Sequence, residues 1–153
     1  MTWRWVPEHE PRWDADKAAA FGDLPPTLFG LGHPEDGRPL GDAWWRVEDD
    51  DGVAVGYGRL DDTWGDAEIL VLAAPAVRGT GVGAFVLENL EREAASRQLN
   101  YVYNVVPTRH PDGEAVRAWL TAHGFTTTEV GELRKRVATG AAPEAALIYE
   151  PLS

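Results

Sequence analysis

The glycine-rich stretch Arg78-Gly79-Thr80-Gly81-Val82-Gly83 follows an apolar run at Ala67–Ala73 and precedes a segment whose apolar residues recur at helical spacing. Glycine tolerates the tight backbone turns that aim successive N–H groups at one point. A helix that begins there adds about half a unit of positive charge at its N-terminus. The stretch therefore predicts a strand–loop–helix unit whose loop binds an anion, with pyrophosphate as the expected ligand.

Two other phosphate-binding motifs fit this stretch poorly. A nucleotide-hydrolysing P-loop requires a lysine after its second glycine, and no lysine occurs here. The dinucleotide fingerprint Gly-x-Gly-x-x-Gly/Ala is formally matched by Gly79, Gly81 and Ala84. That motif begins directly after its strand, whereas Ala74–Arg78 intervenes here. The next strand also ends in Asn104-Val105-Val106, without the carboxylate that would bind a ribose, so this interpretation is disfavoured.

Apolar periodicity and turn residues predict the other elements. Proline and glycine recur throughout, so one domain with many short elements is expected over residues 1–153. Alternating or β-branched runs predict strands at Thr2–Val6, Ala43–Glu48, Val53–Leu60, Ala67–Ala73, Tyr101–Val106, Phe125–Val130, Leu133–Val137 and Ala145–Glu150, with turns at Asp49–Gly52 and Asp61–Gly65. Helices are expected at Asp14–Phe21, Gly81–Arg97 and Asp112–His123, the first capped by Asp14 or Asp16 and the last by Asp112. This order predicts an α/β (α+β) fold with a mixed sheet flanked by helices.

The order of elements and the glycine loop together resemble the GNAT (GCN5-related N-acetyltransferase) superfamily. The acetyl-CoA signature of that family, Arg/Gln-x-x-Gly-x-Gly/Ala, is met by Arg78, Gly81 and Gly83. The resemblance covers residues 43–150, the expected core. It implies a mostly antiparallel central sheet that is splayed at the cofactor site. Residues 1–42 match weakly and would form the variable elements on the substrate side.

The resemblance also implies how acetyl-CoA, the cosubstrate, would be held. In this family the strand before the loop splays from the next strand, and the pantetheine inserts between them. Main-chain groups near Leu72 and Ala73 would bind it, because a gap between strands exposes unpaired backbone groups. The loop amides would bind the pyrophosphate, and Asn104 would help to hold the cofactor or else cap its strand. The expected cofactor-binding residues are Leu72, Ala73, Arg78, Gly79, Thr80, Gly81, Val82, Gly83 and Asn104.

Glu68 occupies the position of a general base in several GNAT enzymes. Only a neutral amine attacks a thioester, and an ammonium of pKa ~10.4 is neutral in about one molecule in 2,500 at pH 7. Glu68 would accept the proton through an ordered water, and an edge carboxylate without a catalytic role is the alternative. The tyrosine that often protonates the CoA thiolate in this family is replaced by Leu120. Tyr103, His110 or water are left as substitutes.

The distribution of charge narrows the class of acceptor. The chain has 14 basic and 25 acidic side chains, of which residues 1–77 hold 6 and 16, so nearly all of the net charge of −11 lies in the first half. An acidic surface repels nucleic acid and attracts a cationic small molecule or peptide. A simple role in solubility would leave the same pattern and is the alternative.

The composition of the chain excludes several classes of catalytic site and metal site and limits where the protein is expected to act. The absence of cysteine excludes thiol catalysis and thiolate metal sites, and the four histidines lack the spacing of a metal site. No apolar run approaches the ~20 residues of a membrane span, and the N-terminus has no signal-peptide core. We therefore expect no metal, no membrane and no nucleic-acid partner, a cytoplasmic location, and either a monomer or a homodimer.

From the residues and the resemblance we predict an N-acetyltransferase. It would transfer an acetyl group from acetyl-CoA to a primary amine of a cationic small molecule or peptide by direct attack. Two alternatives stay open, since fold resemblance alone does not name an acceptor. One is a catalytically silent acyl-CoA-binding regulatory module, and the other is an enzyme of the same fold that uses another acyl-CoA or a hydroxyl acceptor.

Overall fold

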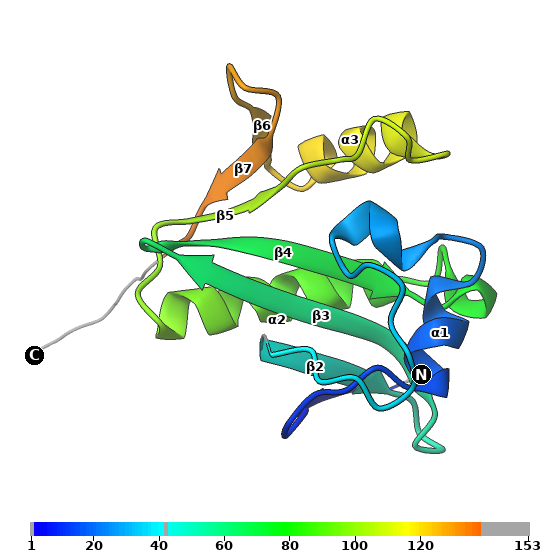
Figure 1. Ribbon diagram of the computed structural model, residues 1–153. Helices are drawn as coiled ribbons and strands as arrows, with labels where there is room; N and C mark the ends of the chain where they lie inside the picture. Colours follow the sequence, from blue (N-terminus) through cyan, green and yellow to red (C-terminus); the bar gives the residue numbers. More distant parts are fainter. Residues whose placement is uncertain (1, 42, 139–153) are drawn as a thin grey trace, which may run out of the picture.

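A single mixed sheet organises the chain, as a computed structural model that describes residues 2–41 and 43–138 shows. Its seven strands lie in the order β1-β2-β3-β4-β5-β7-β6. They are β1 (Arg4–Pro7), β2 (Ala43–Glu48), β3 (Ala54–Thr63), β4 (Asp66–Ala73), β5 (Tyr101–Asn104), β6 (Thr126–Thr127) and β7 (Leu133–Arg136). Neighbouring strands run antiparallel except β4 and β5, which are parallel. The predicted mixed, mostly antiparallel sheet is confirmed (Figure 1).

Helices cover both faces of the sheet. The described residues form α1 (Ala15–Phe21), α2 (Val82–Ser96) and α3 (Gly113–Ala122), with short 3-10 helices η1 (Pro26–Phe29) and η2 (Pro75–Val77). α2 packs the core of one face through apolar side chains such as Val86 and Leu90, and Leu120 of α3 joins the same cluster. On the other face, Phe21 of α1 packs with Trp44 and Tyr57. The protein therefore has two separate apolar layers with the sheet between them.

Local sequence signals explain where several elements begin and turn. The side chain of Asp14 caps α1 by accepting a hydrogen bond from the Lys17 amide at 2.8 Å. In the turn between β2 and β3, Asp49 Oδ1 accepts hydrogen bonds from the amides of Asp51 and Val53, each at 2.9 Å. The predicted cap and the predicted hairpin turn are both confirmed.

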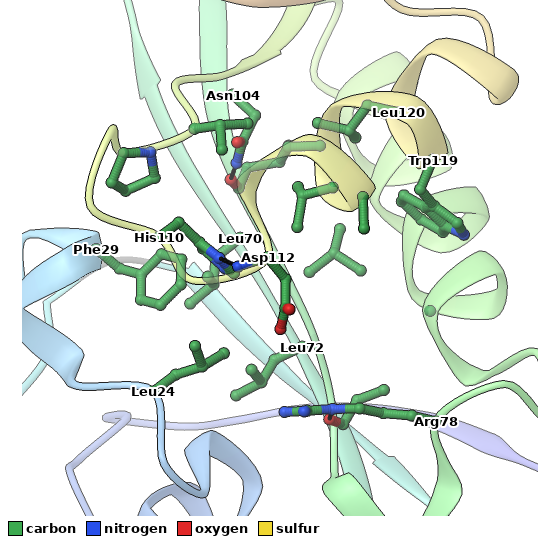
Figure 2. A pocket seen from close by; sticks show the side chains of 18 residues that line it. Leu24, Phe29, Leu70, Leu72, Arg78, Asn104, His110, Asp112, Trp119 and Leu120 are labelled. Atoms are coloured by element: carbon green, nitrogen blue, oxygen red, sulfur yellow. Dashed lines mark hydrogen bonds between the residues drawn. The ribbon is translucent and has the colours of Figure 1, made fainter.

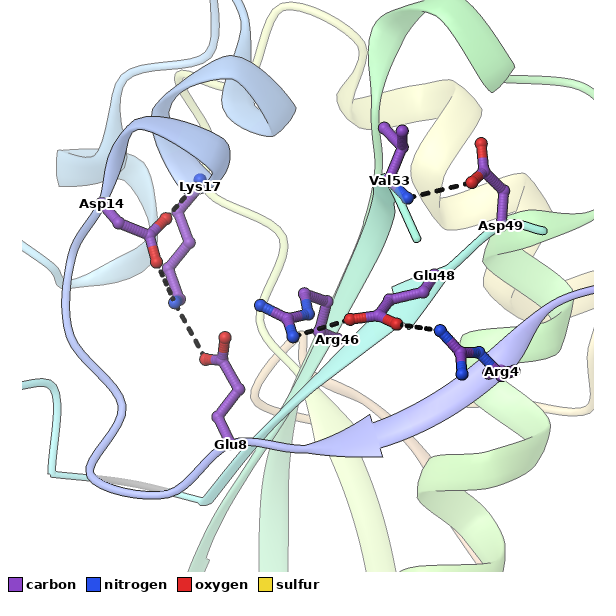
Figure 3. Close-up of polar contacts among 8 residues, drawn as sticks. All are labelled: Arg4, Glu8, Asp14, Lys17, Arg46, Glu48, Asp49 and Val53. Carbon is purple, nitrogen blue, oxygen red and sulfur yellow. Dashed lines mark hydrogen bonds and ion pairs between the residues drawn. The ribbon is translucent and has the colours of Figure 1, made fainter. Parts of the chain in front are cut away.

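A buried lysine fastens α1 to the sheet. Lys17 is fully buried, and its Nζ forms ion pairs with Glu8 at 2.8 Å and Asp14 at 3.2 Å (Figure 3). Nζ also donates to the carbonyl of Arg12 at 2.9 Å and lies 5.0 Å from the centre of the Tyr57 ring. Because a buried charge is tolerated only when its donors are paired, this cluster fixes the position of α1 and of the η1 segment that follows it.

The structure corrects several predicted boundaries. β3 continues to Thr63, so the predicted turn at Asp61–Gly65 is wrong, and the turn consists of Trp64 and Gly65 alone. The strand expected at Phe125–Val130 is reduced to β6. The strand expected at Ala145–Glu150 lies outside the described residues.

Candidate functional site

The candidate site lies where β4 is no longer paired with β5. On one edge β4 pairs with β3 along its whole length, from Asp66 to Ala73. On the other edge it pairs with β5 only over Asp66–Glu68, opposite Tyr101–Tyr103. Beyond Glu68 the two strands separate, as Figure 1 shows. The splayed sheet expected from the resemblance is therefore present at this point.

The alternation of the β3–β4 ladder determines which backbone groups face the gap. The amide of Ala74 donates to the carbonyl of Val55 at 2.9 Å, so the main-chain groups of Leu72, two residues earlier, also point toward β3. Those of Val71 and Ala73 consequently point toward the gap. Of the two residues predicted to offer main-chain groups, Ala73 does so, whereas Leu72 contributes its side chain. Val71 is the residue that the sequence analysis missed.

Two side chains mark the ends of this open edge. Asn104, at the end of β5, donates from Nδ2 to the carbonyl of Ile69 at 2.8 Å and so bridges the strands where their backbone pairing has just ended. Arg78 donates from Nε to the carbonyl of Ala73 at 3.2 Å. The open edge of β4 therefore extends from Asn104 to Arg78.

The glycine loop closes the Arg78 end. Gly79 and Gly81 adopt φ values of 83° and 101°, which lie in the left-handed region that favours glycine. Gly81 is the N-cap of α2 and has no side-chain cap, so the first amides of the helix, at Val82 and Gly83, have no intrahelical partner. An anion can accept hydrogen bonds from these groups. Thr80 instead donates its hydroxyl hydrogen to the carbonyl of Val77, within the loop.

A cavity of about 460 Å³ runs along the gap. Its walls are mainly apolar, with a small number of polar side chains, which is the usual composition of a small-molecule site. Figure 2 shows Asn104 and Arg78 at opposite ends of it, with Leu70 and Leu72 of β4 between them. The polar side chains that line it are Arg78, Asn104, His110 and Asp112. Asp112 is the N-cap residue of α3, as predicted, but its side chain makes no capping hydrogen bond, and its carboxylate points into this cavity (Figure 2).

A second cavity of about 320 Å³ adjoins the first. The two cavities share five of their lining residues, which are Phe29, Ile69, Leu70, Asn104 and Pro107. Glu68, the predicted base, lines only the second cavity, together with the buried side chain of Arg59. Of the nine predicted cofactor residues, five line the first cavity, and the predicted base lines the adjoining one. These five are Leu72, Ala73, Arg78, Gly83 and Asn104, whereas Gly79, Thr80, Gly81 and Val82 are not among the residues that line it.

Glu68, the one acidic residue among those that line the second cavity, has acidic and aromatic neighbours in the sheet. Glu68 lies opposite Asp61 in the β3–β4 register and beside Tyr103 in the β4–β5 register. Burial raises the pKa of the Tyr103 hydroxyl, and the negative charges of Glu68 and Asp61 raise it further. Tyr103 therefore keeps its hydrogen at neutral pH.

The position of the family's usual tyrosine carries no hydroxyl. Leu120 is buried in α3 and lines the first cavity with an apolar surface. The neighbouring Trp119 packs against Gly83, where an added Cβ would lie 3.4 Å from the indole. α3 therefore closes the side of the cavity by packing and offers no acid at Leu120.

Two residues that close the first cavity from the N-terminal side carry no signal in the sequence. Leu24, between α1 and η1, and Phe29, the last residue of η1, line the first cavity. No apolar periodicity in the sequence places these two residues on a particular side of the sheet, so only the tertiary structure shows that they line the cavity.

Among residues 2–41 and 43–138, no group of His, Asp or Glu side chains could hold a metal ion. Within the same residues, no helix is long and apolar enough to cross a membrane.

Comparisons with known proteins agree with this geometry. A sequence model of the acetyltransferase (GNAT) family matches residues 2–125. No protein with a curated description matches the chain. A crystal structure from Klebsiella pneumoniae, described as an acyl-CoA N-acyltransferase, has a TM-score of 0.66 at 20% identity and covers 89% of this chain and 98% of that chain.

Two further solved structures contain a CoA ligand. YncA from Salmonella typhimurium, described as an acetyltransferase and solved with acetyl-CoA, has a TM-score of 0.53 at 24% identity and covers 70% of this chain and 71% of that chain. The PaiA N-acetyltransferase from Thermoplasma acidophilum, in complex with coenzyme A, has a TM-score of 0.52 at 15% identity over 61% of this chain and 59% of that one. At these identities the likeness establishes the shared fold.

Proposed function

Since the chain belongs to the acetyltransferase (GNAT) family, we propose that it is an N-acetyltransferase that uses acetyl-CoA and a primary amine. The observation that carries the proposal is the open edge of β4. Backbone groups of Val71 and Ala73 point into a cavity that ends at the glycine loop. A ligand with amide groups along its length and a pyrophosphate at one end satisfies both features.

The residues of the gap suit a CoA thioester in particular. The loop amides and the start of α2 would bind the pyrophosphate, and the edge of β4 would bind the amide groups of the pantetheine as a neighbouring strand does. The acyl end would then lie toward Asn104, where β4 and β5 meet. The structures solved with acetyl-CoA and coenzyme A support this assignment.

In the proposed reaction the neutral amine attacks the thioester carbonyl carbon. A C–N bond forms, the C–S bond breaks, and CoA leaves as a thiolate that takes a proton from its surroundings. The amine reaches the site mainly as an ammonium, so one proton has to be removed before attack. Glu68 is the carboxylate that adjoins the acyl end of the cavity, and we assign it this role.

We further propose that the acceptor is a small molecule or peptide whose amine is cationic in solution. Glu68, Asp61 and the rest of the acidic first half of the chain would draw it toward the second cavity. The volume of that cavity, about 320 Å³, suits a small molecule or a single extended side chain.

An amine panel tests the proposal. Release of the CoA thiol is measured with acetyl-CoA and with cationic, neutral and acidic primary amines of similar size. We expect the highest kcat/KM for cationic amines. Their KM should rise as added salt shortens the Debye length from ~30 Å at 0.01 M to ~10 Å at 0.1 M.

Each alternative gives a different result in the same panel. Binding of acetyl-CoA without thiol release from any amine would identify the silent module, which the apolar Leu120 favours. Turnover only with a hydroxyl acceptor or a longer acyl-CoA would identify the other enzyme. Preference for an acidic amine would refute the cationic acceptor while leaving acetyl transfer in place.

A further inference from the structure

His110 is held rigidly in the turn between β5 and α3. Its amide donates to the carbonyl of Pro107 at 3.0 Å, and its carbonyl accepts from the amide of Gly113 at 3.2 Å. The imidazole packs edge-to-face against Phe29, with ring centres 6.1 Å apart and the planes at 80°. Both the backbone and the ring therefore have a fixed orientation at the wall of the first cavity.

A backbone amide determines which ring nitrogen carries the hydrogen. Nδ1 of His110 accepts a hydrogen bond from the Asp112 amide at 2.9 Å (Figure 2). An amide N–H can only donate, so Nδ1 presents its lone pair and the neutral ring carries its hydrogen on Nε2. Nε2 has no hydrogen-bond partner among the described residues. The turn thus prepares one N–H donor on a residue of the cavity wall.

The ring lies toward the acyl end of the cavity. In Figure 2 it is level with Leu70, between Asn104 at one end and Arg78 at the other. Leu70 is only two residues beyond Glu68, where the pairing of β4 with β5 stops. If the pyrophosphate lies at the glycine loop near Arg78, the sulfur of the thioester lies on the opposite side of Leu72, in the part of the cavity that His110 lines.

We propose that Nε2–H of His110 donates a hydrogen bond to the CoA sulfur as the C–S bond breaks. It would replace the tyrosine hydroxyl of the family, because Leu120 at that position has none. This inference rests on the proposed function. The ring acts as a neutral donor, because a second proton on Nδ1 would displace the Asp112 amide. Negative charge that forms on sulfur is stabilised by the N–H dipole, and the proton that the free thiolate finally takes comes from water. A hydrogen bond to a charged group of this kind changes an equilibrium by about tenfold or more.

Binding of CoA to the protein tests the proposal without any acceptor. The dissociation constants of CoA and of desulfo-CoA, which lacks the sulfur, are measured by calorimetry from about pH 7 to about pH 9.5, the range in which thiols ionise. The wild-type protein should bind CoA about tenfold more tightly, relative to desulfo-CoA, once the thiol is ionised. Arg78 and Asp112 line the same cavity as His110, and Glu68 lines the adjoining one. Their effect on the part that CoA and desulfo-CoA share cancels in the ratio of the two ligands. Their effect on the thiolate is the same in wild type and in variants of His110, so the comparison of these proteins isolates the ring.

Two variants separate the donor from the turn. Asparagine commonly accepts from the amide two residues ahead, so His110→Asn keeps the bond to the Asp112 amide but removes the ring and its Nε2 donor. His110→Phe keeps a ring against Phe29 but removes both nitrogens. The proposal predicts that both variants lose the preference for ionised CoA and bind desulfo-CoA like wild type, with the melting temperature of His110→Asn unchanged.

Three results would count against this account, and they are distinguishable. A wild-type protein that binds CoA with no preference for its ionised form overturns the role of His110 and leaves the proposed function in place. A His110→Asn variant that keeps the full preference also overturns that role, because it shows that the histidine only holds the turn. A wild-type protein that binds neither CoA nor desulfo-CoA overturns the proposed function itself.

Discussion

The two edges of β4 are formed by the same residues but differ in how far they are paired with a neighbouring strand. Toward β3, eight residue pairs form a continuous antiparallel ladder, whereas toward β5 only three pairs form before the strands diverge. The paired edge contributes to the stability of the sheet. The open edge leaves backbone groups of Val71 and Ala73 facing a cavity. The difference shows that ending a ladder early exposes backbone groups of a central strand to a cavity.

The packing behind the paired edge reinforces this contrast. Gly58 of β3 lies under α2, and a Cβ added there would approach Trp5 to 2.8 Å and Val86 to 2.9 Å. Gly79, beside the open edge, has no neighbouring atom within 4 Å of an added Cβ. One side of β4 is therefore closely packed, and the other opens onto space that a ligand can fill.

The largest effect is expected at Glu68, where the second ladder ends. Glu68→Gln keeps the shape of the side chain but accepts no proton, so kcat should fall about a hundredfold at pH 7. The defect should shrink toward pH 9, because the neutral fraction of an amine of pKa ~10.4 rises about a hundredfold over that interval. The measurement is kcat/KM for wild type and variant from about pH 6.5 to about pH 9.5, at saturating acetyl-CoA.

Asp61→Asn is the matched control for that variant. Asp61 lies opposite Glu68 in the ladder but is not among the residues that line either cavity. Removing its charge should weaken attraction of a cationic amine and leave kcat unchanged. Parallel pH profiles of Glu68→Gln and wild type would exclude Glu68 as the base.

A smaller effect is expected from a charge at the glycine loop. Asparagine and aspartate both tolerate the positive φ of Gly79, so Gly79→Asp and Gly79→Asn differ mainly in charge. A negative charge about 5 Å from a doubly charged pyrophosphate costs roughly 1.7 kcal/mol in water, so Gly79→Asp should bind acetyl-CoA about tenfold more weakly than Gly79→Asn. Calorimetry with both variants measures the difference.

Gly58→Ala is a control that should lower stability and leave the affinity for acetyl-CoA unchanged. Its Cβ would overpack the core between β3 and α2, so the variant should lose about 1–3 kcal/mol of stability. The folded fraction should bind acetyl-CoA like wild type. Equal affinities of Gly79→Asp and Gly79→Asn would show that the anion binds away from the loop.

Local signals in the sequence predicted much of the fold. The Asp14 cap, the Asp49 turn and the glycines before α2 each act within a few residues, so their effect is visible without the tertiary structure. The extension of β3 was missed because its hairpin turn is unusual. Trp64 and Gly65 have φ values of 57° and 87°, as a two-residue turn of this kind requires, but tryptophan is not a residue that signals such a turn.

The candidate site was predicted in outline but not in register. A shift of one residue reverses which backbone groups of a strand face the gap, and only the β3–β4 ladder assigns Val71 rather than Leu72 to it. Asp112 was expected to cap α3 because it precedes the helix, yet its side chain turns into the cavity. Whether the side chain of Asp112 caps α3 or turns into the cavity depends on the cavity walls. These walls come from distant segments, so the local sequence does not predict the outcome.

Hydrogen exchange of individual β4 amides tests the central claim, that the open edge of β4 binds the acyl-CoA. The account predicts an alternating pattern in the free protein, with fast exchange at Val71 and Ala73 and slow exchange at Leu70 and Leu72, whose amides bond to β3. Saturating acetyl-CoA should abolish the alternation by slowing Val71 and Ala73 to the rates of their neighbours. Fast exchange that persists at Val71 and Ala73 in the complex would contradict the account.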